Sequence, residues 1–198
     1  MRLVLLIILL ISITCYGLRS QSVKFNSELT DSFKIGPIKK VIILEPIVPF
    51  DDRIIKNTIK SAVVEEIDTI IDYHFVDNDT YVTKSNNLIT IKRKDIINSQ
   101  KDYDAILIII YSLDVIYDYS LRGMYYPLVP YPESDNYSKI KMFLFDKNGE
   151  LIRKKTTSAL SADRFGFTKN PIKGIKTATM LCTYSIIKKI LNINKNLL

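Results

Sequence analysis

The 198-residue chain contains runs of apolar residues whose spacing changes from segment to segment. Residues 41–44 are continuously apolar, which predicts a buried strand that ends at Pro46. Between residues 55 and 71 apolar residues recur at steps of three and four, so we expect an amphipathic helix that Asp51 or Asp52 caps. Its apolar stripe consists of Ile55, Ile59, Val63, Ile67, Ile70 and Ile71.

The middle of the chain alternates extended runs with turns. Residues 72–76 and 88–91 have the composition of strands, and residues 95–100 suggest a short helix. Residues 103–113, "YDAILIIIYSL", predict the central strand. Period-two alternation over residues 111–121 predicts a strand with one buried and one solvent-exposed face. Three prolines in "GMYYPLVPYP" then interrupt the sheet.

The last third of the chain predicts a hairpin and a closing helix. Asn148-Gly149 separates two extended runs and suits a tight turn. Residues 172–191 form a helical pattern with Ile175, Cys182, Ile186 and Ile190 facing inward. We therefore expect one α+β domain over residues 39–198, with a mixed, mostly antiparallel sheet packed with two long amphipathic helices.

The amino terminus has the pattern of a secretory signal. Residues 3–13 are apolar apart from Ser12 and follow Arg2, but the run is shorter than the roughly 20 residues of a membrane-spanning helix. We expect residues 1–14 to be the signal peptide and residues 15–38 to be a flexible tether, with a strand at residues 23–25 as an open alternative.

Cys15 follows the apolar run, as the lipid-bearing cysteine does in the lipobox of bacterial lipoproteins, which this segment resembles. Ser12 replaces the usual leucine of that motif, and Thr14 replaces its glycine or alanine. The resemblance implies a lipid on Cys15. Cleavage of an ordinary signal peptide after Thr14 or Gly17 is the alternative, because small residues lie one and three places before either bond, as signal peptidase requires.

Composition narrows the range of functions. The formal net charge is +7, but the basic clusters are short and lie in no RNA-binding motif, so we expect no nucleic-acid partner. Cys15 and Cys182 are the only two cysteines, which rules out a disulfide framework. Cys182 falls in an apolar helical pattern, where a small buried side chain is expected.

The sequence contains few residues that could form a catalytic site. His74 is the only histidine, so a metal site of several imidazoles is excluded and one possible base for a hydrolase remains, without a nucleophile motif. Asp114 and Asp118 are about 13 Å apart along an extended strand, beyond the roughly 9.5 Å limit of a glycosidase pair. The "DNDT" stretch at Asp77 lacks the later ligands of a calcium loop. We expect no cofactor, no metal and no enzyme activity.

Several segments together resemble a known group of domains. They are "KKVIILEPI", a long amphipathic helix, "KDYDAILIIIYS", the hairpin "KIKMFLFDKNGELI" and a closing helix. In this order they resemble the domain of small envelope lipoproteins related to the curli-secretion protein CsgG and the amino-terminal domain of TolB, over residues 39–192. The resemblance implies a binding or assembly module, often oligomeric and without catalysis. A pore-forming hairpin is not favoured, because "LIRKKTT" is too charged for a transmembrane strand.

Tyrosines next to the three prolines are the candidate partner-binding residues, because tyrosine gives rigid contact area at low entropic cost. They are Tyr125, Tyr126, Tyr131 and Tyr137. A loop that protects the sheet edge is the alternative.

The sequence thus favours a non-catalytic bacterial envelope lipoprotein, anchored through Cys15 on the periplasmic side of the outer membrane. Its expected partners are other envelope proteins or further copies of itself. There are two alternatives: a secreted interaction protein without lipid, and a hydrolase that uses His74.

Overall fold

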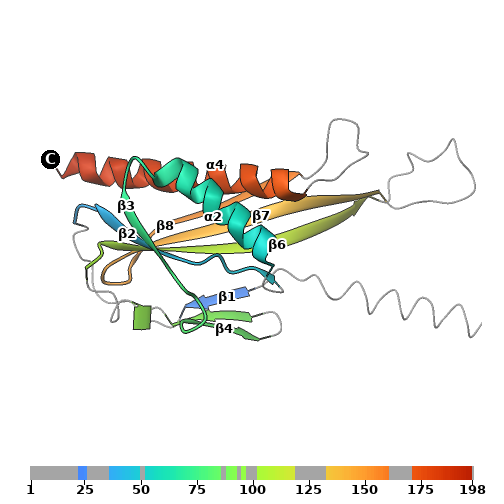
Figure 1. The fold of residues 1–198 in the computed structure, drawn as a ribbon, viewed down its shortest axis with the longest axis horizontal. Coiled ribbons are helices and arrows are strands. Elements are labelled where there is room, and N and C mark those ends of the chain that lie inside the picture. The colour runs from blue at the N-terminus through green and yellow to red at the C-terminus, as the bar shows by residue number, and fades with distance from the viewer. Residues whose placement is uncertain are drawn as a thin grey trace, which may run out of the picture.

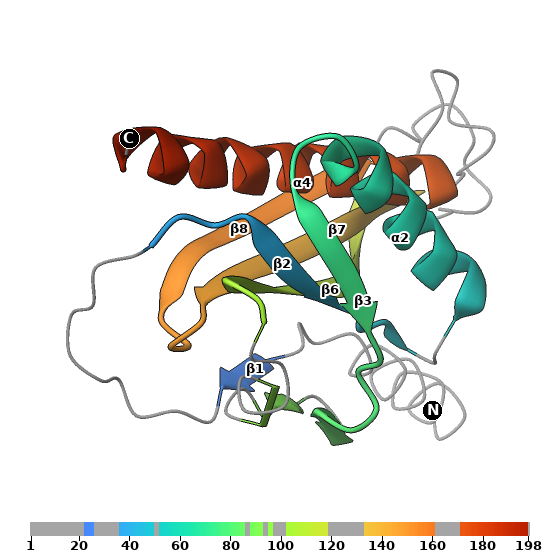
Figure 2. The same cartoon turned by 60° about the vertical axis from the view of Figure 1, so that its left-hand side comes forward.

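The computed structural model describes residues 22–25, 36–49, 52–85, 88–92, 95–96, 102–118, 133–160 and 171–197. Two helices cover one face of a five-stranded sheet, and a smaller three-stranded sheet lies against its other face (Figures 1 and 2). The elements in chain order are β1 (Ser22–Phe25), β2 (Lys40–Leu44), α2 (Arg53–Ile67), β3 (Asp72–Val76), β4 (Val82–Ser85), β5 (Leu88–Ile91), β6 (Ala105–Asp118), β7 (Glu133–Asp146), β8 (Leu151–Leu160) and α4 (Pro171–Asn196).

The larger sheet has the strand order β3-β2-β6-β7-β8. β3, β2 and β6 run parallel, whereas β6, β7 and β8 are antiparallel and form the longer ladders. The expected α+β fold with a mixed, mostly antiparallel sheet and two long helices is therefore confirmed. The predicted central strand and the alternating segment after it form one continuous strand, β6, as far as Asp118.

The helix-side core fills the space between α2, α4 and the larger sheet. Asp52 caps α2 as expected, because its carboxylate accepts hydrogen bonds from the backbone N–H groups of Ile54 and Ile55. The predicted stripe was wrong at Ile70: α2 ends at Ile67, the chain turns toward β3, and Ile70 is 44% exposed. Ile71 is buried, but beyond the end of the helix.

α4 starts at Pro171 and is longer than the sequence pattern predicted. Proline suits the first turn of a helix, where its missing N–H group would have no partner. Ile175, Cys182, Ile186 and Ile190 are buried against the sheet, as the spacing predicted. Near the other end, the Asn194 side chain both accepts a hydrogen bond from the Ile38 N–H group and donates one to the Ile38 carbonyl, each at 2.8 Å.

The opposite face of the larger sheet forms a second core with β4 and β5. Ile89 and Ile91 of β5 pack against a row of β6 residues that includes Ile106 and Ile108. The first half of β6, from Ala105 to Tyr111, is therefore buried on both faces, which explains why this half is apolar without alternation. β1 completes the smaller sheet by pairing parallel to β5. The strand left open as an alternative is thus present, inside the expected tether of residues 15–38.

The turn between β7 and β8 confirms the predicted hairpin. Gly149 donates to the Asp146 carbonyl at 2.9 Å and has a φ of 85°, which favours glycine. The Asp146 carboxylate accepts from the backbone N–H groups of Asn148 and Glu150, at 3.0 and 2.7 Å. Of the expected helix at residues 95–100, only residues 95–96 are described, in helical conformation.

Candidate binding surface

The outer side of α4 presents a stripe of exposed residues with apolar and basic members. They recur at steps of four and three, and they are Thr177, Leu181, Tyr184, Lys188, Leu191 and Lys195. Leu181, Tyr184 and Leu191 are 54%, 58% and 48% exposed, although large apolar side chains are normally buried. A stripe with this alternation matches the narrow seam by which two helices pack.

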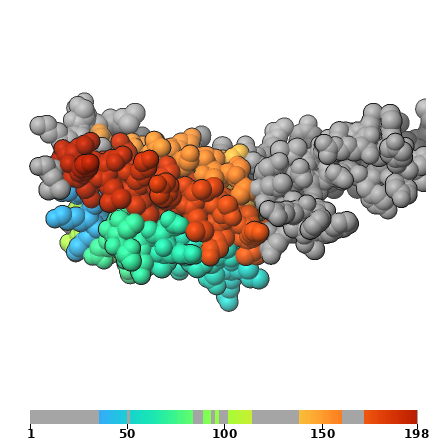
Figure 3. Space-filling view, turned by 90° about the horizontal axis from the view of Figure 1, so that it is seen from above, coloured from blue at the N-terminus to red at the C-terminus, as the bar shows by residue number. Residues whose placement is uncertain are grey.

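β8 adds further positive charge beside this stripe. In Figure 3 α4 forms a continuous ridge along the molecule, with β8 on one side and α2 on the other. α4 and β8 together contain eight basic residues and no aspartate or glutamate. The basic residues are Arg153, Lys154, Lys155, Lys173, Lys176, Lys188, Lys189 and Lys195. Lys154 pairs with Phe143, which lies in the second core, so it is on the other face of the sheet from α4. We call the accessible residues of α4, together with Arg153 and Lys155 on the α4 side of β8, the α4–β8 surface.

Contacts within the molecule offset only part of this charge. Lys176 pairs with Glu65 of α2 at 2.8 Å, where both side chains are about half exposed. The Arg153 guanidinium donates to the Ser185 hydroxyl at 3.4 Å, and Lys154 lies 5.6 Å from the centre of the Phe143 ring. The latter two contacts fix side chains but leave their positive charge in place. The surface therefore has the chemistry to bind an acidic partner.

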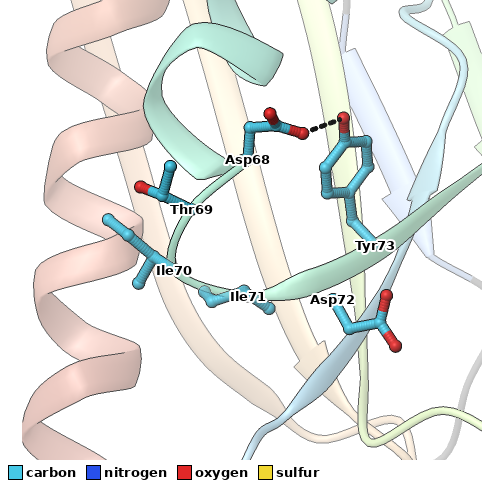
Figure 4. A pocket seen from close by; sticks show the side chains of 6 residues that line it. All are labelled: Asp68, Thr69, Ile70, Ile71, Asp72 and Tyr73. Carbon is cyan, nitrogen blue, oxygen red and sulfur yellow. Dashed lines mark hydrogen bonds between the residues drawn. The ribbon is translucent and has the colours of Figure 1, made fainter.

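The opposite edge of the sheet, at β3, is acidic. Residues 68–83 contain four acidic residues and neither lysine nor arginine. A shallow hollow of about 520 Å³ lies here, formed by consecutive residues from Asp68 to Tyr73 (Figure 4). The Tyr73 hydroxyl donates to Asp68 at 3.1 Å, and partial burial together with this carboxylate raises the pKa of Tyr73. The Tyr73 hydroxyl therefore stays neutral. Its hydrogen bond stabilises the turn that forms the hollow and does not activate the hydroxyl as a nucleophile.

His74 lies on the exposed edge strand β3, and its ring stacks on Tyr103 with 6.5 Å between ring centres. Its strand neighbours Tyr73 and Phe75 pack into the helix-side core, so alternation directs His74 to the other face of the sheet. Cys182 is in the helix-side core, and burial raises the pKa of its thiol to about 11. The sheet thus separates this imidazole from the described thiol, and a cysteine–histidine pair is not formed.

The other predicted site residues are placed only in part. Cys15, Tyr125, Tyr126 and Tyr131 lie outside the described residues. The backbone of Tyr137 is in β7, opposite Asp114 of β6 and Leu160 of β8. Within the described ranges, no three histidine, cysteine, aspartate or glutamate residues come together as metal ligands. The helices described here also include none with the length and apolarity to cross a membrane.

Comparison with known proteins gave matches only among solved structures; no family model and no curated protein matches the chain. One similar structure is the PelC dodecamer from Paraburkholderia phytofirmans, with 10% identity and a TM-score of 0.44 over 81% of this chain and 93% of that one. Another is lipoprotein GNA1162 from Neisseria meningitidis, with 13% identity and a TM-score of 0.42 over 78% and 99%. A third is a minor lipoprotein from Acinetobacter baumannii, with 10% identity and a TM-score of 0.36 over 77% and 92%.

Likeness at this level assigns neither a family nor a function to the chain. Two of the three structures are of bacterial lipoproteins, and the third is an assembly of twelve subunits. The more specific resemblance to CsgG and TolB stays a prediction.

The α4–β8 surface is not apparent in the sequence, because its basic clusters are short and far apart along the chain. Arg153 and Lys155 lie on β8 and Lys188 and Lys189 on α4, and only the packing of α4 over β7 and β8 makes them parts of one surface. The signal that could have revealed it is the lack of acidic residues over residues 171–196 and 151–160.

Proposed function

We propose that this protein is a non-catalytic, lipid-anchored module of the bacterial envelope that binds another protein through its α4–β8 surface. The observation that carries the proposal is that seven basic residues and no acidic residue lie on the α4–β8 surface, together with three exposed apolar side chains of α4. The signal sequence and Cys15 support the envelope location and the anchor.

The chemistry of the surface defines the partner. Leu181, Tyr184 and Leu191 offer an apolar ridge, and Lys188 and Lys195 interrupt it with positive charge. A helix with apolar residues at matching spacing and acidic residues beside them satisfies both features. Two copies of α4 facing each other would instead bring together two basic helices with no acidic residue between them, which disfavours a symmetric pair.

Self-association in a head-to-tail manner is the second candidate. The acidic β3 edge, with Asp68, Asp72, Asp77 and Asp79, lies at the opposite side of the sheet from β8. A second copy could therefore place its acidic edge against the basic α4–β8 surface of the first. Such a heterologous contact either closes into a ring or continues as a filament.

The lipid anchor is tested by expressing the full chain in a bacterium and measuring the intact mass of the membrane-bound protein. We expect acyl chains on an amino-terminal Cys15 and their loss in the Cys15→Ala variant. A product that starts at an unmodified Cys15 or at Leu18 would refute the anchor and favour the secreted alternative.

The binding surface is tested by placing a photo-crosslinking amino acid at Tyr184 in cells. We expect a defined adduct that disappears when Lys188 and Lys195 are changed to glutamate, because the contact requires positive charge. Lys147→Glu in the β7–β8 turn is the matched control, since it changes an exposed lysine away from the surface. An adduct mass of two chains would identify the partner as a second copy, and an adduct insensitive to Lys188 and Lys195 would refute the proposal.

A further inference from the structure

β1 ties the amino-terminal part of the chain to the smaller sheet. Ser22, its first residue, pairs with Leu88 at the start of β5, close to Ser85 at the end of β4. The chain therefore joins the folded domain at the β4–β5 hairpin, well before β2. Only the seven-residue step from Cys15 to Ser22 remains to connect the anchor to this point.

The length of that step limits how far the domain can stand from the membrane. A fully extended chain covers at most about 3.6 Å per residue, so seven residues span no more than roughly 25 Å. The whole stretch from Cys15 to residue 38 would reach about 80 Å by the same measure if it were free. Pairing of β1 thus converts a long tether into a short one.

The layers of the fold decide which surface this short tether brings to the membrane. The smaller sheet lies on the face of the larger sheet opposite α4 (Figures 1 and 2). Packed layers are about 10 Å apart, so the outer side of α4 is roughly 25 Å from the smaller sheet. To place α4 on the membrane, the seven residues would have to run fully extended along the side of the domain.

The charge of the smaller sheet suits an anionic lipid surface. Ile89 and Ile91 of β5 face the larger sheet, so strand alternation places the exposed Lys92 on the outer side, and Lys24 of β1 stands at an outer register position because it pairs with Thr90. A basic residue near an anionic bilayer contributes about 1 kcal/mol of attraction.

From these observations we propose that the smaller sheet lies against anionic phospholipid headgroups in the anchored protein, and that the α4–β8 surface faces the aqueous side. The inference rests on the lipid anchor of the proposed function and names the face that the anchor holds at the membrane. It leaves the α4–β8 surface open to a partner from solution.

The orientation is tested on the chain that starts at Cys15, coupled through the Cys15 thiol to a maleimide lipid. The vesicles contain phosphatidylcholine and phosphatidylglycerol. The Cys182 thiol is buried and its pKa is raised to about 11, so coupling occurs at Cys15. The rate of lysine acetylation is then measured by mass spectrometry at Lys24 and Lys92, and at the exposed α4 residues Lys173, Lys188 and Lys195.

We expect several-fold slower acetylation at Lys24 and Lys92 and unchanged rates at the three α4 lysines. The Cys15→Ser variant, mixed with the same vesicles, gives the rates without coupling. Slowing at the α4 lysines, equal slowing at both sets, or no slowing would overturn the orientation. Full slowing on phosphatidylcholine alone would overturn the role of headgroup charge.

Chemical coupling replaces cellular lipidation in this experiment. A negative result therefore refutes the orientation and leaves the lipoprotein proposal standing. An unmodified Cys15 in the cellular experiment refutes the anchor itself.

Discussion

Replacing Asn194 with alanine should separate the end of α4 from the start of the domain. The Asn194 amide makes two hydrogen bonds of 2.8 Å to the backbone of Ile38, across 156 residues of sequence. Ile38 is only 1% exposed, so water cannot easily replace both partners. The variant would leave one buried donor and one buried acceptor without the groups that satisfy them.

The expected cost follows from these two bonds. Leaving a buried backbone polar group unsatisfied costs about 1 to 3 kcal/mol, and alanine returns about 0.5 kcal/mol through its higher helix propensity. Because Asn194 is only partly buried, we take the lower part of the range and expect a loss of roughly 2 kcal/mol. Asn194→Asp keeps the accepting oxygen but lacks the donor, so it should lose the bond to the Ile38 carbonyl.

Urea unfolding followed by circular dichroism measures this loss. Asn192→Ala is the matched control, because Asn192 lies on the same helix, is exposed, and undergoes the same change of side chain. Equal free energies of unfolding for Asn192→Ala and Asn194→Ala would refute the reasoning, since helix propensity alone would then explain both.

Three further outcomes are expected from local features. Burial raises the Cys182 pKa from 9.0 to about 11, and each pKa unit corresponds to about 1.4 kcal/mol of unfolding free energy. The buried neutral thiol should therefore stabilise the fold fully below pH 9, and this stabilisation should be lost as the pH rises through 11. Urea midpoints across this range should fall less in Cys182→Ala than in the unchanged chain; parallel curves would contradict this. Gly149→Ala should cost about 1 kcal/mol because of its positive φ, seen as a lower melting temperature than that of Lys147→Ala. Asp52→Ala should cost about 1 kcal/mol of unfolding free energy and Asp52→Asn much less, because asparagine also caps helices; equal losses would exclude capping.

Local patterns predicted most of the secondary structure correctly. The steps of three and four in α2 and α4, the continuous run in β2 and the Asn-Gly turn each depend on residues close in sequence. The same local view failed at Ile70, whose spacing fits the stripe although the helix has already ended. Nothing in the spacing shows where the chain must leave the helix to reach its partner strand.

The sequence by itself determined the α+β class, an aspartate cap at residue 51 or 52 and the burial of Cys182, because these follow from periodicity and from the chemistry of neighbouring residues. Only the tertiary structure decided that β2 lies between β3 and β6, that β1 joins the smaller sheet, and that α4 and β8 share one basic surface. These pairings join residues far apart in the chain, so they depend on how all layers bury their apolar faces together. The same packing decides where the protein can bind a partner and which face its anchor can reach.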